Sequence, residues 1–338
     1  MAVAFSGEPT RSTTRVSPHN LSAEESLLGA MLLSREAIAS ATEIVRPEHF
    51  YKPAHGHIFD AVASLYGAGE PADPITVADE LNRAGRKTYL SVGPHGRPPR
   101  AYRGRDFCWW LGVLNKWDLE APPTTDHVTI AVSGAYGGQS VEFRRLAGEG
   151  LVLVGRTTGF SAGVMAFAPD LTKNILRGDA DYLSVLDEAD AYASRNGLDL
   201  PEESLARVFA PDPACMTTPI LSLDLAAAGI TSIIWATGYV QDYGWLPPGA
   251  LDAHGRPQHQ RGVSAEPGIY FLGLPWQSRR GSAFIWGVWH DAKFVADHIL
   301  KLRHYLACPR PAERTGVTAP RARALIDHPD SGAPDDQP

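Results

Sequence analysis

The sequence predicts a multidomain protein in which a small all-α helical bundle precedes an α/β domain. The length of 338 residues exceeds what one domain of about 100–200 residues requires. Apolar residues recur with helical spacing from residue 17 to about residue 85. After that point short apolar strands alternate with helices, which is the pattern of an α/β domain.

Composition limits the classes of protein to which the chain can belong. With 44% hydrophobic and 20% charged residues it can bury a sizeable core, which excludes wholesale disorder. A formal net charge of -7 argues against a surface built for nucleic acid, because such surfaces are basic. We therefore expect no direct sequence-specific binding to nucleic acid.

The cysteines and the apolar runs indicate a cytoplasmic protein without membrane association. Cys108, Cys215 and Cys308 lie far apart with no CxxC spacing, so we expect neither a disulfide framework nor a metal site. No run reaches the ~18 apolar residues that a membrane span needs. Residues 1–16 and the Pro-rich residues 306–338 are predicted to be disordered tails.

Residues 17–81 are predicted to form the helical domain, as four short helices packed in a compact bundle. Each helix start is marked by a capping residue or by a proline. These residues are Ser22 with Glu25 in a capping box, then Ser34, Pro53 and Thr76.

Residues 82–305 are predicted to form the α/β domain, with a largely parallel sheet. Its apolar runs are rich in β-branched and aromatic residues, as buried strands are. The expected strands are residues 89–92, 128–132, 151–154, 232–235 and 269–272. The expected helices are residues 140–146, 171–195 and 284–302.

Three motifs in the helical domain follow the order and spacing of one domain family. They are PHNLSAEESLLG at residues 18–29, FYKPAH at residues 50–55 and GEPADPITVADEL at residues 69–81. The domain therefore resembles the N-terminal domain of DnaB-type replicative helicases, a helical bundle that packs with copies of itself and contacts primase. The resemblance implies self-association or contact with a primosome protein.

The chain contains no GxxxxGK[ST] phosphate-binding loop, which a helicase motor requires. The nearest string, GRKT at residues 85–88, lacks the adjacent Gly-Lys pair. We therefore expect no ATP-dependent helicase activity from this chain.

Five motifs in the α/β part point to a second family. They are RPPRAYRGRD at residues 97–106, WWLG at 109–112, IWATGY at 234–239, FLGLPW at 271–276 and IWGVWHD at 285–291. Residues 78–299 thereby resemble the C-terminal half of flavin-containing monooxygenase-like flavoproteins. The resemblance implies a partial Rossmann-like fold of the kind with two dinucleotide-binding domains, the cofactors FAD and NADPH, and a small-molecule substrate.

Six residues are the candidates for cofactor binding. In the Ala-Thr-Gly turn, a small residue and a glycine let the backbone approach a flavin closely. An arginine without a nearby acid suits the 2′-phosphate of NADPH, although a solvated basic loop and a weak nucleic-acid patch are alternatives. The candidates are Ala236, Thr237, Gly238, Tyr239, Gly273, which ends the last predicted strand, and Arg97.

The GxGxxG fingerprint that binds FAD after the first strand of such flavoproteins is missing. The nearest string, GAGEPA at residues 67–72, follows a segment with helical periodicity. SGAYGG at residues 133–138 follows a predicted strand and is more typical of an ordinary strand-to-helix turn.

The two resemblances meet within residues 74–85, which indicates a fusion and leaves three hypotheses. The chain is an FAD- and NADPH-dependent oxidoreductase of the monooxygenase-like type, incomplete without its first fingerprint unless a partner chain supplies the missing half. Alternatively it is a replication-associated interaction module, or a recombination by-product with no selected activity. No side chain is assigned as a catalytic acid, base or nucleophile. The exposed edge of an incomplete sheet predicts self-association or aggregation.

Overall fold

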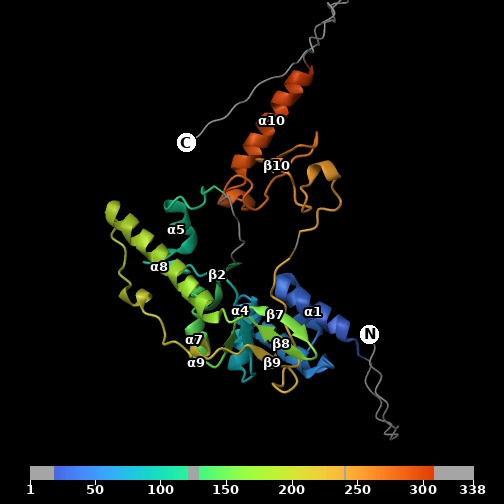
Figure 1. Cartoon of the computed structure of the whole chain (residues 1–338), viewed down its shortest axis with the longest axis vertical. Helices are drawn as coiled ribbons and strands as arrows, with labels where there is room; N and C mark the ends of the chain where they lie inside the picture. Colours follow the sequence, from blue (N-terminus) through green and yellow to red (C-terminus); the bar gives the residue numbers. More distant parts are fainter. Residues whose placement is uncertain (1–18, 121–128, 240, 308–338) are drawn as a thin grey trace, which may run out of the picture.

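The computed structural model describes residues 19–120, 129–239 and 241–307. Figure 1 shows helices α1 to α4 beside a group of short strands and helices, with α10 and β10 further away. The chain thus has an N-terminal helical domain followed by a mixed α/β region. The predicted tail at residues 1–16 lies outside the described residues, as do residues 308–338 of the second tail.

The helical domain contains the four predicted helices, which are confirmed. They are α1 (Leu21–Leu33), α2 (Arg35–Ile44), α3 (Pro53–Gly67) and α4 (Pro74–Arg83), with the 3-10 helix η1 (Pro47–His49) before α3. Their inward faces enclose one core. Its buried members are Leu28, Met31, Ile38, Ala41, Phe50, Ile58, Phe59, Val62, Leu65 and Val77.

The predicted cap of the first helix is wrong by two residues. The side-chain oxygen of Asn20 accepts a hydrogen bond from the N–H of Ala23 at 3.1 Å and caps α1. Asn is among the strongest N-cap residues, so the helix begins before the pattern at Ser22 and Glu25. Ser34 caps α2, as predicted.

Asp73 caps α4, in place of the predicted Thr76. One oxygen of its carboxylate accepts hydrogen bonds from the N–H groups of Ile75 and Thr76, both at 3.0 Å. The other accepts from the hydroxyls of Thr76 at 2.6 Å and Ser133 at 2.8 Å. A carboxylate is a stronger acceptor than a hydroxyl, which explains the correction. The same carboxylate ties α4 to the α/β region.

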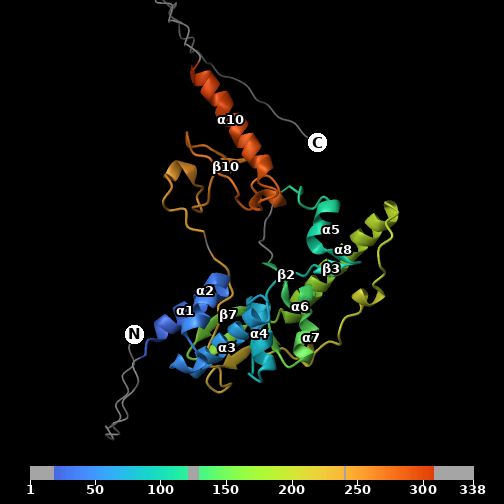
Figure 2. The same ribbon diagram turned by 180° about the vertical axis from the view of Figure 1, so that it is seen from behind.

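Helix α4 contributes to two hydrophobic cores. Val77, with 0% exposure, belongs to the core of the helical domain. Ala78, with 8% exposure, belongs to the core of the α/β region, and Ile75 packs against that core. Figure 2 shows α4 between α3 of the helical domain and α7 of the α/β region. The second core also buries Val92, Ala131, Val141, Phe143, Leu146, Leu151, Leu153, Leu171, Ile175 and Met216.

Two pairs of parallel strands begin the α/β region. Strand β1 (Tyr89–Ser91) pairs with β6 (Val152–Val154), and β2 (His95–Gly96) pairs with β5 (Thr129–Ile130). Strands β1, β5 and β6 lie within the segments where strands were predicted.

The remaining strands of the described residues form antiparallel sheets, so the predicted largely parallel sheet is wrong. Each parallel sheet in the described residues has only two strands. The antiparallel strands in the central part of the chain are β3 (Ala101–Tyr102) with β4 (Arg105–Asp106), and β7 (Thr157–Ser161) with β8 (Val164–Phe167) and β9 (Ser222–Asp224).

Helix α8 (Leu171–Arg195) has the bounds that the sequence predicts. Its first half contributes to the second core, and its second half packs against Trp110 through Leu186 and Ala189. The shorter helices of this region are α5 (Phe107–Val113), α6 (Ala135–Gly138), α7 (Phe143–Gly148), η2 (Ser204–Arg207) and α9 (Ala214–Thr217).

The C-terminal segment, residues 241–307, contacts the chain just after α5. The N–H groups of Arg280 and Gly281 donate to the carbonyls of Leu119 and Trp117, both at 2.9 Å. The segment contains η3 (Pro248–Ala250), β10 (His259–Gln260), β11 (Val263–Ser264), η4 (Arg280–Ala283) and α10 (Trp289–Ala307).

Two strand predictions for the C-terminal third are wrong, and one helix begins later than predicted. Residues 232–235 form no strand, because Ile234 packs on the core of the helical domain instead of joining a sheet. Residues 269–272 form only the isolated bridge of Tyr270 with Val263. The predicted helix 284–302 begins at Trp289, since residues 280–283 turn as η4. None of the described helices combines the length and apolar composition of a membrane span.

Candidate functional site

Arg97 lies inside the α/β region, where it is 2% exposed. Its guanidinium pairs with Asp179 of α8 at 2.8 Å and donates a hydrogen bond to the carbonyl of Val141 at 3.0 Å. The cation also lies over the rings of Tyr182 and Phe209, at 4.5 and 5.2 Å from their centroids. Arg97 is therefore part of the packing around α8 and not of an open basic loop.

A second buried arginine shares the carboxylate that Arg97 binds. Arg144 of α7 lies 2.8 Å from the other oxygen of Asp179 and 2.5 Å from Asp212. Burial acts to lower the pKa of Arg144, but the hydrogen bonds that it donates to both carboxylates outweigh burial and raise that pKa. To reach a phosphate, Arg97 would have to leave Asp179 with one partner in a buried site, which is costly.

The Ala-Thr-Gly segment is exposed and irregular. Ala236, Thr237, Gly238 and Tyr239 are all exposed, and they follow no strand. Gly238 has a positive φ of 76°, a backbone conformation that favours glycine, but the strand expected before it is absent.

Gly273 lies in the C-terminal segment, in a turn with a φ of 80° and open space around it. Within the described residues, no hydrogen bond or ion pair connects Gly273, Arg97 and residues 236–239. Residues 236–239 are exposed whereas Arg97 is buried, so these candidates present no common surface to a dinucleotide. We therefore derive no chemical step through FAD or NADPH.

The two glycine strings do not cradle a phosphate either. Gly67 ends helix α3, so residues 67–72 follow a helix and not a strand. In the loop after β5, the backbone N–H of Tyr136 donates a hydrogen bond to the carboxylate of Glu70 at 2.5 Å. This N–H is therefore not free to bind a phosphate. This loop is the strand-to-helix turn that the sequence favours, and it is used to bind the helical domain.

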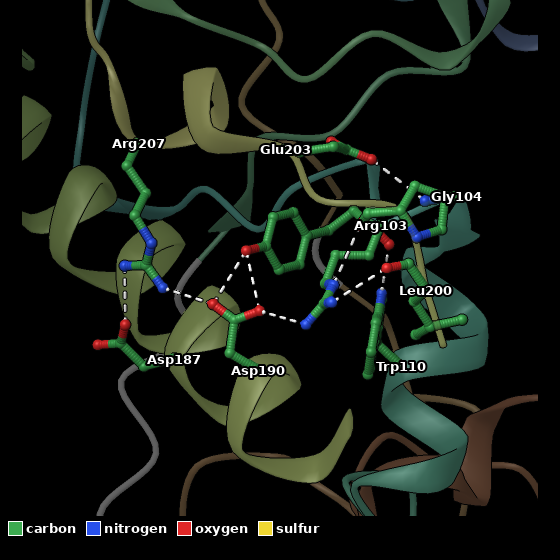
Figure 3. Close-up of polar contacts among 10 residues, drawn as sticks. Arg103, Gly104, Trp110, Asp187, Asp190, Leu200, Glu203 and Arg207 are labelled. Carbon is green, nitrogen blue, oxygen red and sulfur yellow. Dashed lines mark hydrogen bonds and ion pairs between the residues drawn. The ribbon is translucent and has the colours of Figure 1, made fainter. Parts of the chain in front are cut away.

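A polar cluster fixes the chain after α8 against the β3–β4 turn (Figure 3). Asp190 lies between Arg103 and Arg207, at 3.0 and 2.9 Å. The hydroxyl of Tyr102 donates one hydrogen bond shared by the two oxygens of Asp190, each 3.0 Å away. Burial and the bond to Asp190 raise the pKa of Tyr102 to about 12. Burial acts to raise the pKa of Asp190, but hydrogen bonds from these partners outweigh it and lower that pKa. These groups satisfy one another, which is typical of a structural clasp.

Neither of two hollows in the described residues is lined by a cofactor candidate. One of about 30 Å³ lies between α4 and residues 133–146. The other, of about 560 Å³, is an open depression between the end of α5 and the second half of α8. No group of three or more His, Cys, Asp or Glu side chains in the described residues is arranged to hold a metal ion.

The helical domain has a polar clasp of its own. Glu24 of α1 accepts hydrogen bonds from the backbone N–H of Tyr51 at 2.7 Å and from Nδ1 of His55 at 2.8 Å. His55 is buried at the start of α3. Burial acts to raise the pKa of Glu24, but the hydrogen bonds from Tyr51, His55 and Lys52 outweigh it and lower that pKa. One carboxylate thus holds α1 to the beginning of α3.

Large apolar side chains are exposed at the ends of α1 and α2. Leu33 is 67% exposed and Ile44 is 76% exposed, and Leu21 and Tyr51 are also exposed. Such residues enlarge the apolar surface that a partner could cover.

Comparison with known proteins finds two unrelated likenesses in one chain. Residues 16–91 match the family described as DnaB-like helicase N terminal domain. The replicative DNA helicase DnaB of Mycobacterium leprae is 47% identical over 87 residues, which are 26% of this chain and 14% of that protein. The crystal structure of the N-terminal domain of DnaB helicase from Mycobacterium tuberculosis is 57% identical, with a TM-score of 0.20, and covers 20% of this chain and 47% of that one.

The second likeness is to oxidoreductases. The uncharacterized oxidoreductase CzcO-like of Geobacillus kaustophilus is 54% identical over 72 residues, which are 21% of this chain and 21% of that protein. The chain spans about a fifth of the length of this relative and a smaller share of the helicase. The similarity to CzcO-like oxidoreductases is therefore partial, and shorter than the two thirds of the chain over which the sequence analysis finds a resemblance.

Sequence reasoning missed the residues that join the elements. Asp73 could have been found, because an Asp before Pro74 is a strong signal for a helix start. Glu24 and Glu70 gave no local signal, since their partners Tyr51 and Tyr136 lie 27 and 66 residues further along the chain.

The clasp at Glu24 predicts a stability that depends on pH. Because its pKa is lowered from 4.5, the ionised Glu24 stabilises the fold above pH 4.5, and this contribution is lost as the pH falls through the lowered pKa. We expect Glu24→Gln to cost about 1 kcal/mol of unfolding free energy at pH 7 and much less near pH 3 in urea titrations. Glu25→Gln, at an exposed neighbour, is the control. An equal cost for Glu24→Gln at both pH values would contradict the assignment.

Proposed function

We propose that the chain is an interaction module of the DNA-replication machinery, acting through its helical domain by self-association or contact with primase. The observation that carries the proposal is the closed core of α1 to α4, which coincides with the DnaB-like match at residues 16–91. The likeness to a replicative DNA helicase supports a partner from the DNA-replication machinery.

The surface we assign to this role includes the C-terminal ends of α1 and α2. Leu33 and Ile44 expose most of their apolar area there, and burying each in a partner would contribute roughly 1.5–3 kcal/mol. No charged pair is needed for such a contact, so it tolerates physiological salt.

We expect sedimentation velocity of the full chain to show association that strengthens with concentration. The double variant Leu33→Glu with Ile44→Glu should raise the dissociation constant by at least about tenfold, because it introduces charge into an apolar contact. Leu176→Glu, at an exposed leucine of α8, is the matched control and should leave the constant unchanged. A chain that stays monomeric, or a control that weakens association equally, would contradict self-association.

The second candidate function is that of a flavoprotein oxidoreductase that uses FAD and NADPH on a small-molecule substrate. The identity of 54% to a CzcO-like oxidoreductase favours it. The exposed position of residues 236–239 and the buried position of Arg97 weigh against it for the isolated chain.

An absorbance spectrum after incubation with FAD and desalting separates the two candidates. We expect no retained flavin, because the described residues do not converge on a dinucleotide site. Flavin retained at one molecule per chain would overturn this expectation and establish the oxidoreductase candidate, and NADPH oxidation would then be measured.

A further inference from the structure

Residues 231–239, the acceptor-bound segment, form neither helix nor strand, contact the helical domain through Ile234 and carry the Ala-Thr-Gly motif. Figure 1 shows this part of the chain rising from beyond β9, past α1, toward the C-terminal segment. Ile234 is half-buried and packs on the core of the helical domain. A segment with the composition of a buried strand is therefore docked on helices.

The docking follows the alternation of an extended chain. Ser232 and Ile234 are half-buried, whereas Ile233 and Trp235 are exposed, Trp235 at 63%. In extended backbone, alternate side chains point to opposite sides. One side of the segment thus faces the helical domain and the other presents an isoleucine and a tryptophan to solvent.

The contact is held by side-chain packing alone. Residues 231–239 form no hydrogen bond with any residue that the structure describes. The hydroxyl of Ser232 is buried without a partner, which costs free energy and opposes tight docking. A contact with one apolar anchor, an unsatisfied hydroxyl and an unpaired backbone is readily exchanged for an equivalent one.

We propose that the helical domain carries an acceptor site for an isoleucine in an extended apolar segment, filled in cis by Ile234 and open in trans to the same segment of a second copy of this chain. The inference rests on the proposed function, since it names the segment that the interaction module binds. Identical copies supply a matching segment at equal concentration, and its unpaired backbone leaves it free to exchange between them.

A fluorescent peptide with the sequence of residues 229–239 tests the proposal, read by fluorescence anisotropy with the full chain. The chain variant Ile234→Ser vacates the acceptor site, so it should bind the peptide at least about tenfold more tightly than the wild-type chain, whose own segment competes. A peptide carrying Ile234→Ser should lose binding. A peptide carrying Ile233→Ser, changed on the solvent side, should bind like the unmodified one.

The chain variant Ile234→Ala is a smaller change that also empties the acceptor site, and it serves if Ile234→Ser fails to fold. Far-UV circular dichroism of both variants should match that of the wild type. No binding to either folded variant, or equal binding of the two altered peptides, would overturn the acceptor site. Peptide binding by a chain that stays monomeric in sedimentation would contradict both the exchange in trans and the proposed self-association. Self-association without peptide binding would contradict the acceptor site alone, so the two failures are distinguishable.

Discussion

Helix α4 constrains the whole molecule because it is packed from two sides. Val77 closes the core of the helical domain and Ala78 closes that of the α/β region, so neither core is complete without the same ten-residue helix. Asp73 and Glu70 extend this joint with hydrogen bonds to Ser133 and to the N–H of Tyr136. The helicase-like part and the oxidoreductase-like part of the chain are thus joined through helix α4, which both cores share, and not through a linker.

This joint helps to explain why the flavoprotein-like residues contact other parts of the fold. Polar groups that could have bound a dinucleotide are used within the fold, as Arg97 is by Asp179 and the loop after β5 is by Glu70. The segment with Ile234 packs on helices where the sequence predicts a strand. Exposed apolar side chains remain on the helical domain, at Leu33 and Ile44, and also in the C-terminal segment, at Trp245 and Ile285.

Local signals predicted the helices well and the long-range contacts poorly. Pro53 and Ser34 mark helix starts by their own chemistry, and the periodicity of residues 171–195 fixes α8 without help from the rest of the chain. Residues 232–235 have the composition of a strand, but a strand also requires a neighbour, and composition does not show which surface is available. The burial of Arg97 depends on Asp179, 82 residues away, and so it could not be read from a local cluster of arginines.

Native-state hydrogen exchange tests most directly whether α4 makes the two cores one cooperative unit. Leu153→Ala opens a cavity in the α/β core, at a fully buried position of β6, and should cost about 2–5 kcal/mol. In this variant the amides of α3 are expected to lose protection together with those of α8, whereas Val132→Ala, at an exposed position, changes neither. Wild-type protection of α3 in a Leu153→Ala chain that has lost protection in α8 would show two independent domains and contradict the account.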